Sequence, residues 1–411
     1  MFVIALIALL SMPPSVVRAD AAGDVVLDWN AIMVTTVSGQ NPFAQARLAA
    51  ITQVAVFEAV NSITLDHEPY LEPVAAPPGA SADAAAVAAA HAVLSFYLPS
   101  AAPALDAARA TSLAAIPDGL PKDDGVAVGQ AAAAQLITLR GSDGSAPPQF
   151  AQPTATEPGA WQTTPSCPAA GGILFHWQNL RPFGVRSNAQ FRVDPPPALS
   201  SPEYARDYNE VLSVGSSTST ARPQDRADAA RVYAALSAVG AWNRAAEQLA
   251  AGEPLSLSEH ARILAVLNMA LSDGLASSME SKYHYRFWRP ETAIRAGDTD
   301  GNDRTPGDAN FAPYITTPCF PGYPSAHASA SYAGRSILER VWGGAGHSIE
   351  ISHPAVQGVV LQYASLKQIT DDIDDARVYG GIHFRFDQEA GGKQGQKVGQ
   401  YVFAHFLQPL E

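Results

Sequence analysis

Apolar side chains recur every three or four positions through most of the chain, which is the spacing of helices with one buried face. In the first half, this spacing and several Ala-rich segments predict helices over residues 43–63, 81–98, 101–115 and 123–140. In the second half, it predicts helices over residues 202–216, 224–250, 257–285, 324–343, 354–369 and 388–408. No long segment alternates between apolar and polar residues as a β-strand does. We therefore expect a mainly α fold, a helical bundle in which antiparallel helices pack closely through small side chains.

Residues 141–203 lack this periodicity and are rich in Gly, Ser, Pro and Trp. Loops of this length are unusual inside a compact domain and are often functional or wrap around it. We predict a single helical domain over residues 24–411, with residues 141–203 lying across its surface. Within this domain, residues 24–250 supply the N-terminal helices and residues 251–411 form the half that carries the candidate chemistry.

The first residues form a short apolar run followed by small residues that suit cleavage after Ala19 or Ala21. The run is too short to cross a bilayer, so residues 1–19 are interpreted as a secretory signal peptide, although no Lys or Arg precedes the run. We therefore expect a secreted or periplasmic protein with no integral membrane segment in its mature chain. In such a compartment Cys167 and Cys319 could form a disulfide, but two independent thiols are the simpler interpretation.

Hydrophobic residues make up 47% of the chain and charged residues 16%, which is enough apolar material for a large core. The 39 acidic residues outnumber the 26 Lys and Arg residues and leave a net charge of −13. This charge argues against nucleic acids and anionic membrane surfaces as partners. It also makes local clusters of Lys and Arg conspicuous, and the last third of the chain contains three segments of interest.

The first segment places Lys282 and Arg289 on either side of the aromatic-rich sequence YHYRFW, just before Pro290. Seven positions apart, the two cations would share one face of a helix that continues to the proline. On their own they could form a solvated basic patch. Their aromatic neighbours indicate burial instead, and buried cations need an anionic partner.

The second segment, Pro324-Ser325-Ala326-His327, precedes a helix rich in Ala and Ser. The free N–H groups and the dipole of a helix N-terminus favour a bound anion. Ser325 can donate its hydroxyl, and His327 can accept or donate a proton. Taken alone, this segment is more often an ordinary N-cap with a packed histidine.

The third segment contains Arg377, Gly381, His383 and Asp387. His383 and Asp387 are four positions apart and would share a helical face, so the carboxylate would fix the imidazole tautomer. Arg377 adds a fork of donors suited to phosphate-like oxygens, and Gly381 lets the backbone approach a bound group closely. Alone, this would be an ion pair near a helix start. Together, the three segments supply the cations, neutral donors and histidines that a tetrahedral oxyanion requires.

In order and spacing these segments resemble three motifs shared by vanadium-dependent haloperoxidases and the type 2 phosphatidic acid phosphatase superfamily. The motifs are Lys-x6-Arg-Pro, Pro-Ser-Gly-His and Ser-Arg-x3-Gly-x-His-x3-Asp, and this chain differs at Ala326 and Ala376, which replace a glycine and a serine. The sequences FEAVNSI, GAWQTTP and HWQNLRPF also resemble the soluble, exported bacterial branch of this superfamily. The resemblance therefore covers nearly the whole mature chain and implies its helical-bundle fold.

As a haloperoxidase, the chain would bind vanadate as its cofactor, with vanadium on a ring nitrogen of His383. The resemblance implies that the vanadate site also includes Lys282, Arg289, Ser325, the backbone N–H of Ala326, Arg377 and Gly381. His327 would be the acid–base residue and Lys282 would polarise the peroxide, with hydrogen peroxide, halide and an organic acceptor as the reactants. Phe320 falls at the halide-pocket phenylalanine of chloroperoxidases, but Met279 falls where these enzymes have a tryptophan. The halide preference therefore stays open.

As a phosphatase, the same site would need no vanadate. His383 would attack the phosphorus of a phosphoester and form a phosphohistidine, oriented by Asp387. His327 would protonate the leaving oxygen and then activate water. A protein that only binds an oxyanion is a third possibility, but binding alone would not require both histidines. We favour the haloperoxidase because the whole chain resembles that branch.

Overall fold

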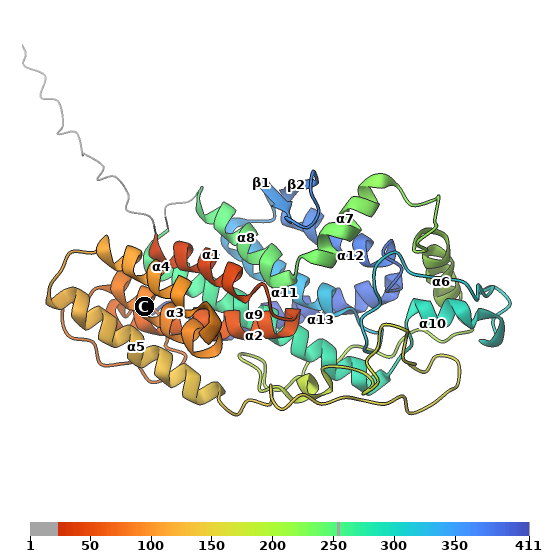
Figure 1. Ribbon diagram of the computed structural model, residues 1–411, viewed down its shortest axis with the longest axis horizontal. Helices are drawn as coiled ribbons and strands as arrows, with labels where there is room; N and C mark the ends of the chain where they lie inside the picture. Colours follow the sequence, from red (N-terminus) through yellow and green to blue (C-terminus); the bar gives the residue numbers. More distant parts are fainter. Residues whose placement is uncertain (1–23, 253–254, 411) are drawn as a thin grey trace, which may run out of the picture.

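The structure is a computed structural model that describes residues 24–252 and 255–410, and it is mainly helical (Figure 1). This confirms the predicted fold class. The predicted signal peptide, residues 1–19, lies outside the described residues.

The first half of the chain forms five α-helices at one end of the elongated molecule (Figure 1). They are α1 (Val25–Val37), α2 (Pro42–Thr64), α3 (Ala82–Tyr97), α4 (Ala102–Ala114) and α5 (Leu120–Arg140), with a short 3-10 helix η1 (Pro99–Ala101) before α4. Helix α1 was not among the predicted elements; Asp24 caps it by accepting the N–H groups of Val26 and Leu27. Helices α3 and α5 pack through small residues as predicted, because a Cβ on Gly129 of α5 would lie 2.2 Å from the carbonyl oxygen of Ala85 in α3. The predicted antiparallel arrangement is wrong for this pair, since Gly125 meets Ser81 in the same way and both helices therefore run in one direction.

Helix α2 is the central helix of this half. By length and composition it could cross a membrane, but 89% of its most apolar window is buried inside the protein. Such a helix is the core element expected of a globular fold. No other helix among the described residues is long and apolar enough to span a bilayer.

The second half contains the helices that carry the candidate site. They are α6 (Pro202–Val214), α7 (Gln224–Ala235), α8 (Ala238–Ala250), α9 (Leu257–Tyr285), α10 (Pro290–Arg295), α11 (Ala326–Trp342), α12 (Leu366–Val378) and α13 (Arg385–His405), with a 3-10 turn η3 (Gly297–Thr299). The single helix predicted over 224–250 is wrong, because the chain becomes extended at Leu236 and Ser237 caps a new helix. The interruption matters because the turn between α7 and α8 faces the site.

The helix predicted over residues 354–369 is also wrong, because part of this range forms a strand. The strands β1 (Ala345–Ser352) and β2 (Val360–Ser365) make an antiparallel hairpin with Ile349 opposite Tyr363. Ile349 and Ile351 are buried while their neighbours are not, an alternation too short to stand out in the sequence. Helix α12 begins only at Leu366, where a capping box starts it.

Helices α11 and α13 run parallel in very close contact. A Cβ on three glycines of α13 would lie 1.9–2.5 Å from carbonyl oxygens of α11 or of its cap. The contacts pair Gly391 with Ser325, Gly395 with Ser329 and Gly399 with Ala333. Because both sets advance together along the sequence, the two helices begin at the same end. Two positive helix N-termini therefore meet at one place.

Residues 141–203, called the wrapping segment below, run along the outside of the helices (Figure 1). Before α6 begins at Pro202, the only helix within them is a 3-10 turn, η2 (Phe175–Asn179). The buried Asp273 of α9 holds this segment by accepting the N–H groups of Phe183, Gly184 and Val185 at 2.6–2.9 Å. The segment is also joined covalently to the second half.

Cys167 and Cys319 form a disulfide across 152 positions of sequence, so the expectation of two independent thiols is wrong. Two distant thiols meet only because the wrapping segment returns to the loop before α11. The end of the chain returns as well, since Leu410 donates its N–H to the carbonyl of Asp66. A continuous apolar core, extending from Val26 to Leu407 in sequence, joins the two halves.

Candidate oxyanion site

Lys282 is fully buried in the last turn of α9. Its Nζ donates to the carbonyl oxygens of Pro321 at 2.9 Å and Gly322 at 2.7 Å. The helix ends at Tyr285, and Arg286 adopts a left-handed conformation with φ 48°. The prediction of one helix running to Pro290, with both cations on one face, is therefore wrong. Lys282 and Arg289 reach the site from two separate elements.

Arg289 caps helix α10 and is also fully buried. Its Nε donates to the carbonyl of Phe320 at 2.9 Å, and its Nη1 donates to the carbonyl of Ile382 at 2.9 Å. The same Nη1 lies 2.9 Å from Nε2 of His383. Its Nη2 is buried without a hydrogen-bond partner among the described residues. This arginine thus links the first and third sequence segments directly.

His383 lies two residues before α13, and Asp387 lies in the first turn of that helix. The prediction that they share a helical face is wrong, but the pair is present: Nδ1 of His383 lies 2.8 Å from Oδ2 of Asp387. The same carboxylate oxygen accepts the N–H of Phe384 at 3.1 Å and so caps the helix. With its proton on Nδ1 toward the carboxylate, the imidazole keeps a free lone pair on Nε2.

Ser325 is the N-cap of α11, as the sequence predicts, and its Oγ accepts the N–H of Ala328 at 3.3 Å. Its own N–H donates to the carbonyl of Asp387, which ties the second segment to the third. The amide of Ala326 is one of the free groups at this helix start, and Ala326 lines the cavity described below. Nε2 of His327 is buried without a partner among the described residues.

Arg377 lies in the last turn of α12, and its Nη1 donates to the carbonyl of Tyr233 at 3.0 Å. Its Nε is buried without a partner in the part of the chain that the structure describes. The ring of Tyr233 also packs edge-on against His327, with 6.1 Å between centroids. Sequence reasoning missed Tyr233. It supplies a backbone carbonyl and a ring edge from a distant helix, and neither leaves a recognisable motif.

Gly381 lies close to the site but has a packing contact of its own. Its φ is +79°, and a Cβ there would lie 2.3 Å from the carbonyl oxygen of Gly215. Its N–H donates to the carbonyl of Val378 at 2.9 Å. Glycine is therefore required at this position by conformation and by contact with the end of α6. Its predicted contact with an oxyanion stays a prediction.

A cavity of about 560 Å³ opens beside these groups, with His327, Arg377 and His383 in its wall. Phe320 also lines it, and its ring centroid lies 5.3 Å from Nζ of Lys282 and 5.0 Å from Cζ of Arg289. Both distances suit cation–π contacts. Met279 is buried in the core and is not part of the cavity wall.

Electrostatics at the site are set by buried positive charge. Burial, with Arg289 as a neighbour, lowers the pKa of Lys282 well below its usual range. Burial lowers the pKa of Arg289 to about 9 and that of Arg377 to about 10. Burial also raises the pKa of Asp387 to about 7, even with these cations nearby. An anion with several negative charges would compensate the cost of keeping the cations charged.

Both histidines are neutral at neutral pH. Burial and the nearby Arg377 lower the pKa of His327 to about 3. Burial and the surrounding cations, Arg289 foremost, lower the pKa of His383 well below its usual range. A neutral imidazole is the form that accepts a proton or offers a lone pair.

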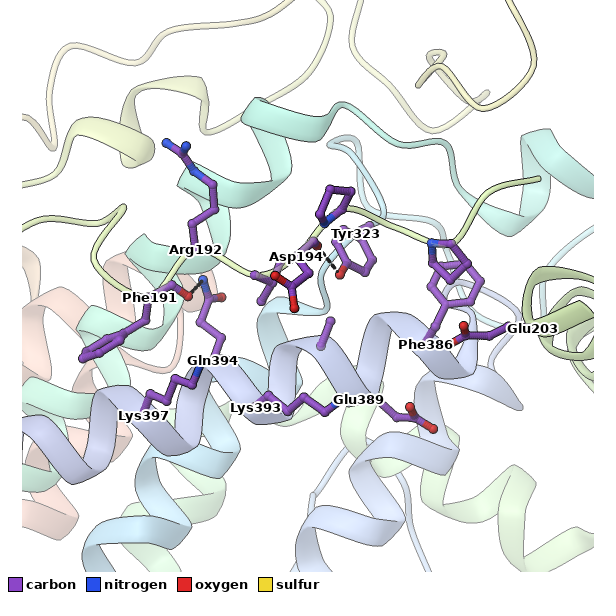
Figure 2. A pocket seen from close by; sticks show the side chains of 14 residues that line it. Phe191, Arg192, Asp194, Glu203, Tyr323, Phe386, Glu389, Lys393, Gln394 and Lys397 are labelled. Carbon is purple, nitrogen blue, oxygen red and sulfur yellow. Dashed lines mark hydrogen bonds between the residues drawn. The ribbon is translucent and has the colours of Figure 1, made fainter. Parts of the chain in front are cut away.

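A second hollow, of about 350 Å³, lies between the wrapping segment and α13 (Figure 2). Tyr323 donates its hydroxyl to the carbonyl of Asp194 at 2.7 Å, and Gln394 donates to the carbonyl of Phe191 at 3.1 Å. These bonds fix Tyr323 immediately before the Pro324–Ser325 turn. The hollow mixes carboxylates with lysines, and neither site histidine lines it. It therefore supports the loop of the site but lacks the concentrated positive charge of the main cavity.

Comparisons with known proteins agree with this fold. Residues 262–411 match the family model of the VCPO second helical-bundle domain. A bacterial vanadium-dependent iodoperoxidase superposes with a TM-score of 0.77 over 94% of this chain and 97% of its own, at 24% identity. The holo form of a bacterial vanadium-dependent chloroperoxidase gives a TM-score of 0.72 over 90% of this chain and 93% of its own, at 16% identity. No curated protein sequence matches the chain.

Residues 262–411 thus carry the VCPO second helical-bundle domain, and the chain has the fold of two bacterial vanadium-dependent haloperoxidases. Both findings support the family that the sequence motifs indicate. At these identities the solved structures support the fold, whereas the activity of this member has to be argued from its own residues.

The residues of this site fit a tetrahedral oxyanion such as vanadate. Three buried nitrogen atoms at the site lack a partner within the described residues: Nη2 of Arg289, Nε of Arg377 and Nε2 of His327. Buried polar groups are normally satisfied, so three unpaired nitrogen atoms at one site indicate an absent ligand. Four oxyanion oxygens can accept from both arginines and from the amide of Ala326. No cluster of His, Cys, Asp and Glu suited to a metal cation was found in the described residues.

Proposed function

We propose that the protein is a vanadium-dependent haloperoxidase that oxidises halide with hydrogen peroxide at a vanadate held by His383. The observation that carries this proposal is the neutral His383, whose Nε2 accepts from Arg289 and is surrounded by the charges of Lys282, Arg289 and Arg377. Vanadate, when bound, supplies the electrophilic centre that activates peroxide. The reaction consumes one proton: H2O2 + X⁻ + H⁺ gives HOX + H2O.

The protein groups around His383 would bind and orient the anion. Asp387 keeps the proton on Nδ1, so that Nε2 faces the cavity as a lone pair. Arg289 now donates Nη1–H toward this nitrogen and would turn that bond to an oxyanion oxygen, together with its unpaired Nη2. The Oγ of Ser325 accepts the N–H of Ala328, and this bond does not use its hydroxyl hydrogen. Ser325 can therefore donate that hydrogen to the anion.

His327 and Lys282 would act on the reactants. Nε2 of His327 has no partner within the described residues and the ring is neutral at neutral pH, so the tautomer protonated on Nδ1 would accept a proton at Nε2 from hydrogen peroxide entering the cavity. It would then return this proton to the departing oxygen, and the further proton that the reaction consumes comes from the solvent. The charge of Lys282, held by two carbonyl groups, would stabilise negative charge that develops on oxygen.

A phosphatase is the alternative, because the same lone pair on His383 is positioned to attack phosphorus. Asp387 would orient the nucleophile, and His327 would protonate the leaving alcohol oxygen. The arginines would stabilise charge on the transferring phosphoryl group. This reaction needs no vanadate, and vanadate would inhibit it.

The two functions can be separated with one purified sample. Orthovanadate-loaded protein is assayed for peroxide-dependent halogenation of a phenolic dye with chloride, bromide and iodide, and vanadate-free protein is assayed with p-nitrophenyl phosphate. We expect vanadate-dependent halogenation that is lost in His383→Ala and kept in His347→Ala, a substitution at a half-buried histidine of the β1–β2 hairpin. Phosphate release that vanadate inhibits, without halogenation, would instead establish the phosphatase.

We also propose that the protein is exported. The Cys167–Cys319 disulfide supports this location, because such bonds persist in the periplasm and outside the cell. Fractionation of cells that express the full chain tests it. Recovery of the protein only in the reducing cytoplasm would contradict the proposal.

A further inference from the structure

The cavity is much larger than the small reactants of halide oxidation require. Its volume is about 560 Å³. A water molecule occupies roughly 30 Å³ in the liquid, and peroxide and halide are of a similar order of size. Most of the space therefore has no role in binding peroxide and halide.

Six apolar side chains line this cavity beside polar ones such as Gln40, Asn41 and Ser237. The apolar side chains come from α2, the wrapping segment, the α7–α8 turn, α9 and the loop before α11. These side chains are Phe43, Ile173, Leu174, Leu236, Leu275 and Ile315. An apolar wall offers nothing to a hydrated halide ion, whereas it favours the burial of a hydrocarbon surface. None of these residues belongs to the three sequence motifs.

Another hollow, of about 390 Å³ and distinct from the one beside α13, adjoins this wall and shares four lining residues with the cavity. They are Gln40, Asn41, Ile173 and Leu174. The hollow also contains the rings of Tyr97, Phe150 and Trp177. The charge of Arg47 in its wall is already paired with Asp143 at 2.7 Å. Apolar surface thus continues beyond the cavity and away from the charged site.

We infer that this cavity binds a neutral, largely apolar organic acceptor, an electron-rich ring, and that its halogenation takes place there. The inference rests on the proposed haloperoxidase function and names its substrate class. In the transfer, R–H + HOX gives R–X + H2O: the carbon–halogen bond forms, the O–X bond breaks, and the proton leaves carbon for the departing hydroxide. A cationic acceptor would be repelled by Lys282 and the arginines, and an anionic one would compete with the oxyanion for them.

Ala235 offers a way to fill the cavity without disturbing the core. It is the last residue of α7, it is exposed, and it lines the cavity. Ala235→Trp would place a large ring in the space assigned to the acceptor. Ala110→Trp is the matched control, because Ala110 is likewise exposed but lines a separate hollow beside Lys122.

The first measurement is calorimetric titration of 1-naphthol into protein without vanadate, peroxide or halide. We expect saturable binding by the wild type and by Ala110→Trp, and binding at least ~10-fold weaker in Ala235→Trp. No saturable binding by the wild type, or equal binding by Ala235→Trp, would overturn the inference. This arm does not depend on whether the protein has haloperoxidase activity.

The second measurement uses vanadate-loaded protein and compares naphthol iodination with triiodide formation in the absence of naphthol. We expect the ratio of the two rates to fall at least ~10-fold in Ala235→Trp and to be kept in Ala110→Trp. An unchanged ratio would show that a diffusible oxidant halogenates naphthol in solution. If the wild type forms no triiodide, the haloperoxidase proposal fails, while the binding titration still reports on the cavity.

Discussion

At the scale of single residues, the site depends on side chains that satisfy each other incompletely. Arg289 uses Nε and Nη1 for two carbonyls and for His383, yet leaves Nη2 unpaired. Arg377 likewise has an unpaired Nε although its Nη1 is bonded. If every donor of these arginines had a protein partner, the site would be an ordinary stable core. Donors without a protein partner can instead bind a ligand that has many acceptors.

Replacing Arg289 by lysine should show whether vanadate binding needs only the positive charge or also the arrangement of the guanidinium donors. Lysine keeps one positive charge but cannot donate simultaneously to two carbonyls, to His383 and to the oxyanion. We expect Arg289→Lys to bind vanadate at least ~10-fold more weakly, which equilibrium dialysis measures directly. Arg192→Lys, at a partly exposed pair with Glu280, serves as control. Unchanged affinity in Arg289→Lys would mean that charge alone holds the anion.

At the scale of elements, the close parallel contact of α11 and α13 brings the two histidine segments together. Glycine in α13 is required because the carbonyl groups of α11 occupy the space of a side chain. The hydrogen bond from the N–H of Ser325 to the carbonyl of Asp387 locks the two helix starts. The geometry of the site is therefore a consequence of backbone packing one to three turns away.

Adding a methyl group to this contact should disturb the site from a distance. A Cβ on Gly395 would lie 1.9 Å from the carbonyl oxygen of Ser329, so the helices must move apart. We expect Gly395→Ala to lower the free energy of unfolding by about 1–3 kcal/mol and to weaken vanadate binding. Urea unfolding and dialysis measure the two effects. Gly39→Ala is the control, since a Cβ there meets nothing within 4 Å; equal stability of the two variants would refute the packing argument.

Helix α2 carries a buried carboxylate that should make stability depend on pH. Burial raises the pKa of Glu58 to about 7, and its Oε1 accepts the N–H of Tyr70 at 2.6 Å. Because the folded pKa lies above the unfolded one, the neutral form is favoured by folding. The stabilisation from neutral Glu58 is therefore complete below pH 4.5, the ordinary pKa of a glutamate, and is lost as the pH rises through about 7.

The comparison of wild type with Glu58→Gln isolates this effect, since the amide keeps an oxygen acceptor for Tyr70. Between pH 5 and pH 8 we expect the wild type to lose up to ~3 kcal/mol of unfolding free energy relative to the variant. Urea unfolding over this pH range measures the difference. Parallel pH profiles of the two proteins would show that Glu58 does not titrate in this range.

At the scale of the whole molecule, an acidic protein surrounds a cationic site. The net charge is −13, yet the charges of Lys282, Arg289 and Arg377 all act on His383, which lines the cavity. The wrapping segment helps to enclose this site, because Cys167 is joined to Cys319, the neighbour of Phe320. The core also joins the ends of the chain, so the cavity is supported from both halves.

Removing the disulfide that ties the wrapping segment to the loop before α11 should lower the free energy of unfolding without removing any site residue. In the double variant Cys167→Ser and Cys319→Ser, we expect a loss of about 2–5 kcal/mol, because the bond closes a long loop in the unfolded chain. Thermal unfolding measures the loss as a lower Tm. A reductant should lower the Tm of the wild type similarly and leave the double variant unchanged. A Tm equal to that of the wild type would show that the wrapping segment is held by Asp273 and other contacts alone.

The sequence by itself determined the mainly helical fold, the N-cap at Ser325 and the chemical inventory of the site. These features depend on local spacing and residue type, which do not need the rest of the chain. Lys282, Arg289 and Arg377 could be singled out because buried cations in an acidic protein need a partner.

The tertiary structure alone decided how these residues meet. The end of α9 at Tyr285 and the hairpin over 345–365 depend on contacts between distant segments, and these contacts override the local helical pattern. The Cys167–Cys319 bond, the carbonyl of Tyr233 on Arg377 and the apolar cavity wall have the same origin. Each brings together positions far apart in the chain, whereas a sequence pattern records only what neighbouring positions have in common.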